Sequence, residues 1–238
     1  MPERIALDEV SKSKGKSKFA TVVSDLDNRS LLEVIDSHKS DEIIEDLPAQ
    51  PLAVRENVKE VSVDLWGGFP KVIKEVFPNA LIVIDRFHVM KLVNKALNQL
   101  RLSLELKGLK NRSLLLKNGQ GLTEQEKLDL QKLLRTSPCL AIAYELKEEF
   151  REIYETSTTL KMGKRRLQKW LVSARYLFGQ TAQTIEKHIN EICHYFISRT
   201  TSGIMEGLNN KIKLILRQSY GFKNFERMRE KLLACLFK

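Results

Sequence analysis

The feature that most constrains the fold is a change in hydrophobic pattern near His88. Before it, short apolar runs alternate with turn-forming segments, and after it apolar residues recur at helical spacing, as at Val89, Val93 and Leu97. Short runs bounded by turns are typical of strands, whereas a period of about 3.6 residues is typical of helices. We therefore expect a sheet region followed by an all-helical region.

Five strands are predicted in the first ninety residues, at 5–10, 19–24, 30–35, 58–63 and 80–84. A hairpin meander followed by β-α-β units predicts an α/β fold with a mixed five-stranded sheet and flanking helices. This order fits an RNase H-like core interrupted by an all-helical insertion. The expected domains are a first core segment at residues 1–100, the insertion at 101–196 and the last core helices at 197–238.

Three carboxylates occupy positions that favour a shared site. Asp8 and Asp64 each end an apolar run, and Glu206 lies at the start of an amphipathic helix. Carboxylates at two strand ends and on one helix can converge on a single edge of a sheet. Such oxygen ligands suit two Mg²⁺ ions, or Mn²⁺ in their place, and the chemistry of phosphodiester cleavage. The alternative for a strand-end Asp is an ordinary turn cap.

Asp85 is a rival for the second position, because it also ends an apolar run. Its other interpretation is the N-cap or ion-pair partner of the following helix. His88 follows three residues later, so the two side chains can share a helix face. We expect this pair to support the metal ligands from behind or to contact DNA, with a purely structural histidine as the alternative.

Charge is unevenly distributed in this chain of net charge +10. Residues 1–90 hold 12 Lys/Arg against 16 Asp/Glu, whereas residues 91–238 hold 28 against 14. A basic surface beside a local acidic site suits a polyanion held next to metal ions. Solvated lysine-rich helix faces are the alternative explanation.

Two basic groups are candidates for DNA contacts. The first is a stripe on one face of the helix of Glu206, where Asn210, Lys213 and Arg217 follow the carboxylate. The second is the densest basic run of the chain, residues 161–170. A carboxylate followed by Asn, Lys and Arg predicts a metal ligand leading into phosphate contacts. In the basic run, Trp170 is expected in the core, with stacking on a base as the alternative. The predicted DNA-binding residues are Lys164, Arg165, Arg166, Asn210, Lys213 and Arg217.

The remaining composition is that of a cytoplasmic globular protein. Cys139, Cys193 and Cys235 lack metal-ligand spacing and are expected to be free thiols in a reducing compartment. No apolar run approaches the ~20 residues of a membrane span, and no secretory signal precedes the first strand.

Several motifs together resemble a known family. They are Leu7-Asp8-Glu9, Phe77-Pro78-Asn79-Ala80 leading to Asp85-Arg86-Phe87-His88-Val89, Gly203 to Lys213 with Glu206 inside it, and Tyr220-Gly221-Phe222. Over nearly its whole length the chain resembles bacterial insertion-sequence transposases of the ISL-three type, a branch of the DDE transposases. The last two motifs are the specific ones.

The resemblance implies an RNase H-like catalytic domain that cleaves and joins DNA at transposon ends. Asp8, Asp64 and Glu206 would form its metal-binding catalytic triad, and Asp85 and His88 would match a [C/D]xxH motif of related transposases. The implied partners are double-stranded DNA, both transposon ends and target, and further copies of the chain assembled on DNA. The implied location is the bacterial cytoplasm, at the nucleoid.

In one respect the chain departs from this family pattern. Such transposases usually carry a zinc-binding and helix-turn-helix region before the catalytic domain, whereas Asp8 is almost at the start here and zinc-ligand spacing is absent. We therefore expect largely sequence-independent DNA binding. The alternatives are a truncated, non-catalytic DNA-binding remnant and an RNase H-like nuclease without strand transfer.

Overall fold

The protein is seen in a computed structural model that describes residues 1–12, 19–47, 50–65, 68–201, 203–222 and 224–237. The chain forms two compact units. The sheet unit combines Met1–Phe87 with Ser198–Lys238, and the helical unit is His88–Ile197. The predicted insertion starts at residue 101, whereas the helical unit starts at His88. The difference arises because α4 (Arg86–Ser103) is one continuous helix that follows directly after the last strand.

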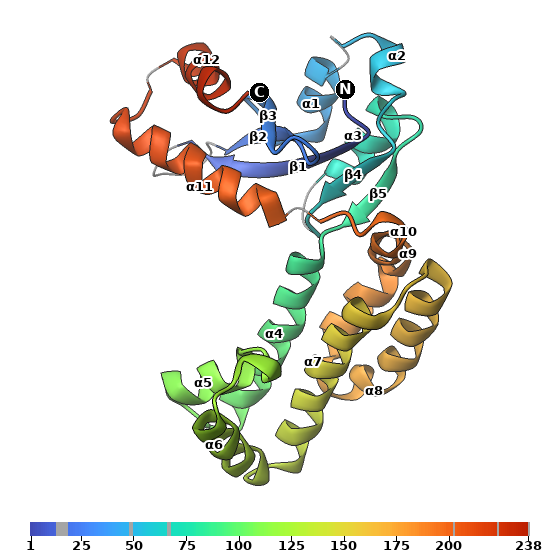
Figure 1. Ribbon diagram of the computed structural model, residues 1–238, viewed down its shortest axis with the longest axis vertical. Helices are drawn as coiled ribbons and strands as arrows, with labels where there is room; N and C mark the ends of the chain where they lie inside the picture. Colours follow the sequence, from blue (N-terminus) through green and yellow to red (C-terminus); the bar gives the residue numbers. More distant parts are fainter. Residues whose placement is uncertain (13–18, 48–49, 66–67, 202, 223, 238) are drawn as a thin grey trace. The chain divides into compact units, whose positions relative to one another are not determined.

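The sheet unit is built on one five-stranded mixed sheet with the order β3-β2-β1-β4-β5 (Figure 1). Its strands are β1 (Arg4–Ser11), β2 (Phe19–Asp25), β3 (Ser30–Ile35), β4 (Glu60–Val63) and β5 (Leu81–Ile84). The first three pair antiparallel as a meander, and β1, β4 and β5 pair parallel. The predicted α/β fold of RNase H-like type is therefore confirmed.

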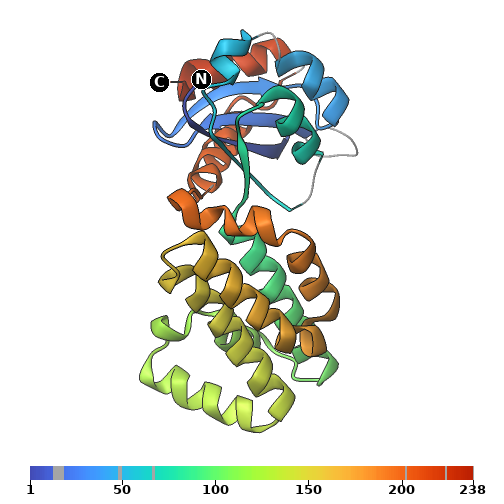
Figure 2. The same cartoon turned by 90° about the vertical axis from the view of Figure 1, so that its right-hand side faces the viewer.

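Helices cover both faces of this sheet (Figures 1 and 2). Strand alternation divides β1 between two cores, with Ile5 and Leu7 facing one and Ala6 and Val10 the other. The first core is closed by α1 (Ser40–Asp46) and α3 (Phe69–Val76), and a short helix α2 (Leu52–Arg55) precedes β4. The second core is closed by α11 (Gly203–Gln218) and α12 (Phe225–Leu236).

The helical unit contains helices and no strand, a statement that covers every residue from 88 to 197. Its further helices are α5 (Leu109–Leu116), η2 (Gly119–Gly121), α6 (Glu124–Arg135), α7 (Pro138–Thr156), α8 (Leu160–Lys187), α9 (Ile189–Cys193) and α10 (Tyr195–Ser198). Helix α6 opens with a capping box in which Thr123 and Glu126 each accept the other's backbone N–H.

The core of the helical unit lies between α7 and α8. Trp170 is 1% exposed, donates its indole N–H to the carbonyl of Leu146 at 2.8 Å and packs on Phe150 with ring centroids 4.7 Å apart. The expected core position of Trp170 is thus confirmed. Gly179 has a φ of 23°, where glycine is favoured, and divides α8 into two helical segments.

The three cysteines are free thiols, as predicted. Cys139 and Cys235 are exposed, whereas burial raises the pKa of Cys193 to about 12. Among the described residues, no helix is both long and apolar enough to cross a membrane.

Candidate active site

The carboxylates Asp8, Asp64 and Asp85 follow neighbouring parallel strands at one edge of the sheet. Pairing of Ala6 with Ser62 and of Val63 with Ile84 sets the register of β1, β4 and β5. The backbone N–H of Asp85 donates to the carbonyl of Val63 at 2.9 Å, which continues the ladder by one step. Extended in this register, Asp8 lies beside Asp64 and Asp64 beside Asp85, with strands about 4.8 Å apart.

Strand alternation directs these carboxylates to the face that α11 covers. Leu7 and Val63 belong to the opposite core, so the residues after them turn toward α11. A direct contact supports this for Asp8, whose Oδ2 accepts a hydrogen bond of 2.7 Å from Nδ2 of Asn209 in α11. The contact joins residues 201 positions apart in the chain.

Helix α11 places Glu206 close to this contact. Met205, Leu208 and Ile212 are buried against the sheet and fix the rotation of the helix. Glu206 is exposed and precedes Asn209 by three residues, so both side chains lie on one side of α11. Glu206 therefore lies one helical turn from the residue that binds Asp8.

Hydroxyl groups hold the segment that leads into α11. Ser198 and Thr200 donate to the buried carboxylate of Glu60 at the start of β4, and Thr201 Oγ1 donates to Asp85 Oδ1 at 2.9 Å after the end of β5. The segment is thus tied first to one end of the parallel strands and then to the other. This path delivers the start of α11 to the edge that carries the aspartates.

Exposure distinguishes the two candidates for the second position. Asp85 is 1% exposed and accepts the Thr201 hydroxyl, whereas Asp8 and Asp64 are partly exposed. A metal ligand needs at least one oxygen open to the ion, so this difference favours Asp64. His88 is partly buried in the first turn of α4, within the helical unit.

The donor set at this edge fits a hard divalent cation. Asn209 Oδ1, on the side chain that contacts Asp8, is buried and has no hydrogen-bond partner among the described residues. Ser62 Oγ in β4 is likewise buried and without such a partner. Oxygen atoms of this kind next to carboxylates are the ligands that Mg²⁺ and Mn²⁺ prefer. In the described part of the chain, no three His, Cys, Asp or Glu side chains form a group that could hold a metal ion, so the metal site stays a prediction.

Glu9, the residue after Asp8 in β1, has a pKa that its surroundings shift. Burial raises the pKa of Glu9 above its ordinary value, and the charge of Asp8 acts in the same direction while His38 opposes it. Asp8 itself accepts the backbone N–H of Glu9 at 2.8 Å through Oδ1. The two oxygens of Asp8 therefore have one hydrogen-bond donor each, which fixes the plane of the carboxylate.

The predicted DNA-binding residues fall into two groups that differ in structure. On α11, Asn210, Lys213 and Arg217 are all exposed along the side that carries Glu206. On α8 the three predicted residues differ in exposure, since Arg165 is exposed whereas Lys164 and Arg166 are half-buried. Lys164 binds Asn190 Oδ1 at 2.8 Å and Arg166 binds Glu152 and Thr156, because each flanks the buried face of the helix.

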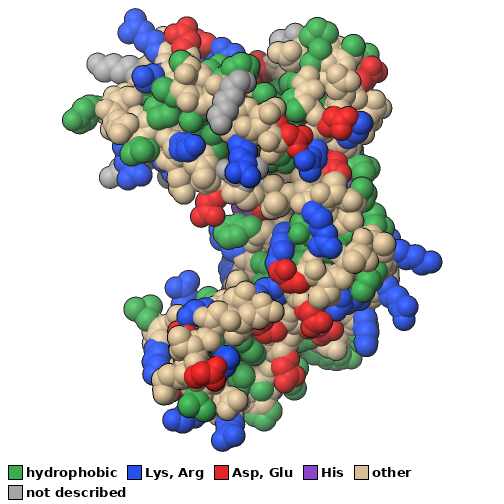
Figure 3. Space-filling model, in the orientation of Figure 1, with side chains coloured by type: hydrophobic (Ala, Val, Ile, Leu, Met, Phe, Trp, Pro, Cys, Tyr) green, Lys and Arg blue, Asp and Glu red, His purple; other side chains and the backbone are tan. Residues whose placement is uncertain are grey.

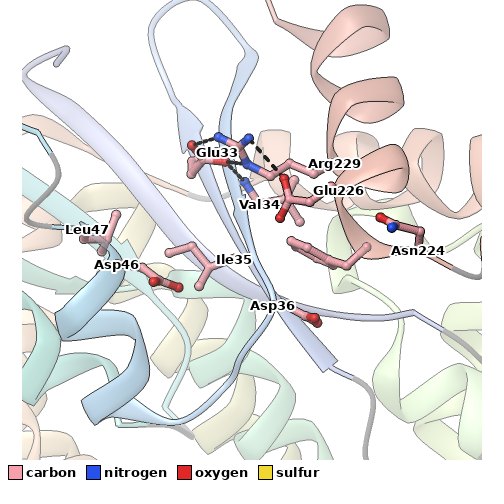
Figure 4. A pocket seen from close by; sticks show the side chains of 10 residues that line it. Glu33, Val34, Ile35, Asp36, Asp46, Leu47, Asn224, Glu226 and Arg229 are labelled. Carbon is pink, nitrogen blue, oxygen red and sulfur yellow. Dashed lines mark hydrogen bonds and ion pairs between the residues drawn. The ribbon is translucent and has the colours of Figure 1, made fainter.

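A groove beside the edge strand β3 is a contrasting site (Figure 4). It measures about 640 Å³ and is lined by four carboxylates and one guanidinium. Arg229 of α12 binds Glu33 of β3 through two hydrogen bonds of 2.5 and 2.6 Å. Its excess of negative charge makes this groove unsuitable for a polyanion.

Sequence reasoning did not assign the residues that position the candidate ligands: Asn209, Thr201 and Glu60. Asn209 had a usable signal, since it stands three residues after Glu206 on the helix. The partners of Thr201 and Glu60 follow only from the way the last segment of the sheet unit folds back onto β4 and β5.

Transposases are among the known proteins that are similar to this chain. A protein-family model for DDE transposases of the ISL-three type matches residues 5–232 of this chain. The transposase of insertion sequence element IS1001 from Bordetella parapertussis is 26% identical over an alignment of 239 residues. The alignment covers 94% of this chain and 58% of that protein.

The transposase of insertion sequence element IS1557 from Mycobacterium tuberculosis (strain CDC 1551 / Oshkosh) is 27% identical over 261 residues. The match covers 93% of this chain and 57% of that protein, so the chain spans little more than half the length of these relatives. Because the family model matches nearly the whole chain, the chain belongs to the ISL-three family of DDE transposases.

Proposed function

We propose that this chain cleaves DNA strands and transfers the freed ends, in a metal-dependent reaction at the sheet edge of Asp8, Asp64 and Glu206. The observation that carries the proposal is the hydrogen bond between Asp8 and Asn209, because it brings the helix of Glu206 to the strand of Asp8. Membership of a transposase family and the shared register of the aspartates support it further.

Each residue has a distinct role in this proposal. Asp8, Asp64 and Glu206 hold the ions, and Asn209 and the Glu9 amide orient Asp8. Asp85 braces the segment before α11 through Thr201. Two bound Mg²⁺ or Mn²⁺ ions would activate the attacking oxygen, first of water and then of a 3′-hydroxyl, and would neutralise charge on the phosphate.

The substrate in this proposal is double-stranded DNA, both transposon end and target. Asn210, Lys213 and Arg217 continue from Glu206 along the exposed side of α11, where they would contact phosphates on either side of the cleaved bond. The similarity to transposases of bacterial insertion sequences supports action on the bacterial nucleoid. Several copies of the chain would assemble on the DNA to bring two ends together.

Glu206→Gln tests the proposal. This variant keeps the size of the side chain but removes its charge, so Mg²⁺- or Mn²⁺-dependent nicking of a supercoiled plasmid should fall below detection while duplex binding remains. Glu230→Gln, an exposed acid on α12, is the matched control and should nick normally. Undiminished nicking by Glu206→Gln would refute the catalytic assignment. Nicking without joining of oligonucleotide ends would instead indicate the nuclease alternative.

A further inference from the structure

Helix α8 carries an unusual concentration of positive charge along nearly its whole length. Residues 160–185 contain six cations and no Asp or Glu. Most charged helices intersperse the two signs, since pairs of opposite charge stabilise a solvated helix. A long acid-free segment in a domain that carries acids elsewhere therefore indicates a partner of negative charge.

Burial divides these cations into two groups. Leu167, Trp170 and Ala174 are buried against the rest of the helical unit. Lys164, Arg166 and Arg175 have partners within the chain, Asn190, Glu152 with Thr156, and Glu186 respectively. These three contribute to the packing and surface pairing of the helical unit.

The other cations lie on the side of α8 that faces solvent. Lys161, Arg165 and Lys169 follow one another at intervals of four residues and are exposed, and none of them forms an ion pair with a described acid. They also line a hollow of about 480 Å³ with Thr159, Met162 and Arg166. In Figure 3, Lys and Arg side chains project from the side of the helical unit where Figure 1 draws this part of α8.

Two apolar side chains continue the same line. Val172 and Tyr176 follow Lys169 by three and seven residues and are 60% and 87% exposed. The ring of Tyr176 therefore contributes almost nothing to the core. We call Lys161, Arg165, Lys169, Val172 and Tyr176 the α8 stripe.

We propose that the α8 stripe binds an unpaired strand of nucleic acid, with the three cations on successive phosphates and Tyr176 stacked on a base. A helix rises 1.5 Å per residue, so the cations are about 6 Å apart and Tyr176 lies about 10 Å beyond Lys169. Single strands are bound in this way, by a basic track that ends on aromatic rings. The inference rests on the proposed function in one respect, that the substrate is DNA.

Two other ligands explain the stripe less well. A fully paired duplex offers phosphates to the cations but no free base to the ring. An anionic membrane surface would suit cations beside exposed apolar groups, but the apolar groups here follow the cations along one line and do not form an opposite face. An unpaired strand, in contrast, offers phosphates to the cations and the face of a free base to the ring.

The test measures binding by the full chain in EDTA, so that cleavage does not intervene. Fluorescent probes are a blunt duplex and the same duplex with a single-stranded tail. Tyr176→Ala should weaken binding to the tailed probe roughly tenfold and leave the blunt probe unchanged, because stacking on one base is lost. Tyr176→Phe keeps the ring and should bind as the parent does.

The cations are tested by replacing Lys161, Arg165 and Lys169 together with Ala. For the tailed probe, the steepness of the plot of log affinity against log salt concentration should fall by about 2, since three phosphate contacts on a single strand are lost. The control replaces Lys107, Lys132 and Lys187, which are exposed cations of the same unit, and should change it much less. Circular dichroism spectra confirm that each variant is folded.

Three results would overturn the inference. The first is an equal loss of affinity for the blunt and the tailed probe in Tyr176→Ala. The second is a stripe triple variant that binds the tailed probe as tightly as the control triple variant does. The third is binding to phosphatidylserine vesicles that depends on the α8 stripe while binding to tailed DNA does not. Failure of the catalytic proposal is distinguishable, because nicking by Glu206→Gln leaves these metal-free binding results unaffected.

Discussion

The sheet edge and the α8 stripe hold their charged groups in opposite ways. At the sheet edge, Asp8 and Asp85 each accept a hydrogen bond from a side chain of a distant segment. On the stripe, Lys161 and Arg165 form no ion pair with the acids that the structure describes. The difference indicates that the edge needs fixed geometry, as metal ligands do, whereas the stripe needs only positive charge at the correct spacing.

The distribution of charge between the two units follows the same division. The helical unit holds 19 Lys/Arg against 11 Asp/Glu, and the sheet unit, over its full sequence, holds 21 against 19. Carboxylates that attract metal ions also repel phosphates, so strong general attraction for DNA is better placed away from them. Variants that affect one region and spare the other test this division of roles.

The largest effect is expected from Asp64→Asn. If Asp64 is the second metal ligand, its loss should reduce metal-dependent nicking by more than roughly 100-fold. That factor is the upper end for residues that only hydrogen-bond to a metal ligand. Asp85→Asn should keep measurable nicking and mainly lower stability, by about 1 kcal/mol, since its bond from Thr201 weakens. A nicking time course and a thermal melt of each variant give the two values.

Thr201→Val is the control for this pair, because it removes the hydroxyl that Asp85 accepts and leaves the carboxylate in place. It should resemble Asp85→Asn in both measurements. Complete loss of nicking with Asp85→Asn and normal nicking with Asp64→Asn would exchange the two assignments.

The next effect concerns Asn209, which orients Asp8. Asn209→Ala removes the hydrogen bond of 2.7 Å and should reduce nicking about 10- to 100-fold. Its apparent affinity for Mn²⁺ should fall by a similar factor, measured from the metal dependence of the rate. Gln218→Ala, which removes an exposed amide at the end of the same helix and away from the side of Glu206, is the matched control. Equal losses in the two variants would show that the contact to Asp8 does not matter.

Much of this arrangement was predictable because the signals were local. Apolar runs ending in Asp8 and Asp64 indicated strands with acids at their ends, and the structure has β1 and β4 at these runs. The order of strands also follows simple rules, since a hairpin meander and right-handed crossovers leave few topologies.

What could not be predicted depended on contacts between distant segments. Lys164, Arg165 and Arg166 are adjacent in sequence, and only the packing of α8 shows that Arg165 faces solvent while its neighbours have internal partners. Likewise, the burial of Asp85 and its hydrogen bond from Thr201, which distinguish it from Asp64, depend on the folded chain. Side-chain partners across long loops leave no local pattern.

A smaller effect is expected from Gly163→Ala in the core of the helical unit. An added Cβ would lie 2.2 Å from the ring of Phe196, so the buried ring must shift. Overpacking of this kind should lower the free energy of unfolding by about 1–3 kcal/mol, measured by urea titration. Gly121→Ala, where a Cβ would meet nothing within 4 Å, should be neutral. Nicking at low temperature should remain, because the change is confined to the helical unit.

The smallest effect tests whether α11 combines both kinds of charged group. Lys213 and Arg217 are exposed on the side of Glu206, and together they should account for about two phosphate contacts on a duplex. Replacing both with Ala should lower the logarithmic salt dependence of binding by about 2 and weaken unrelated duplexes by the same few-fold factor, because phosphates carry no sequence information. Lys211, on the other flank of the helix, is the matched control as Lys211→Ala. A loss that differs between duplex sequences would mean that these side chains read bases, and α11 would then be a recognition element as well as the carrier of Glu206.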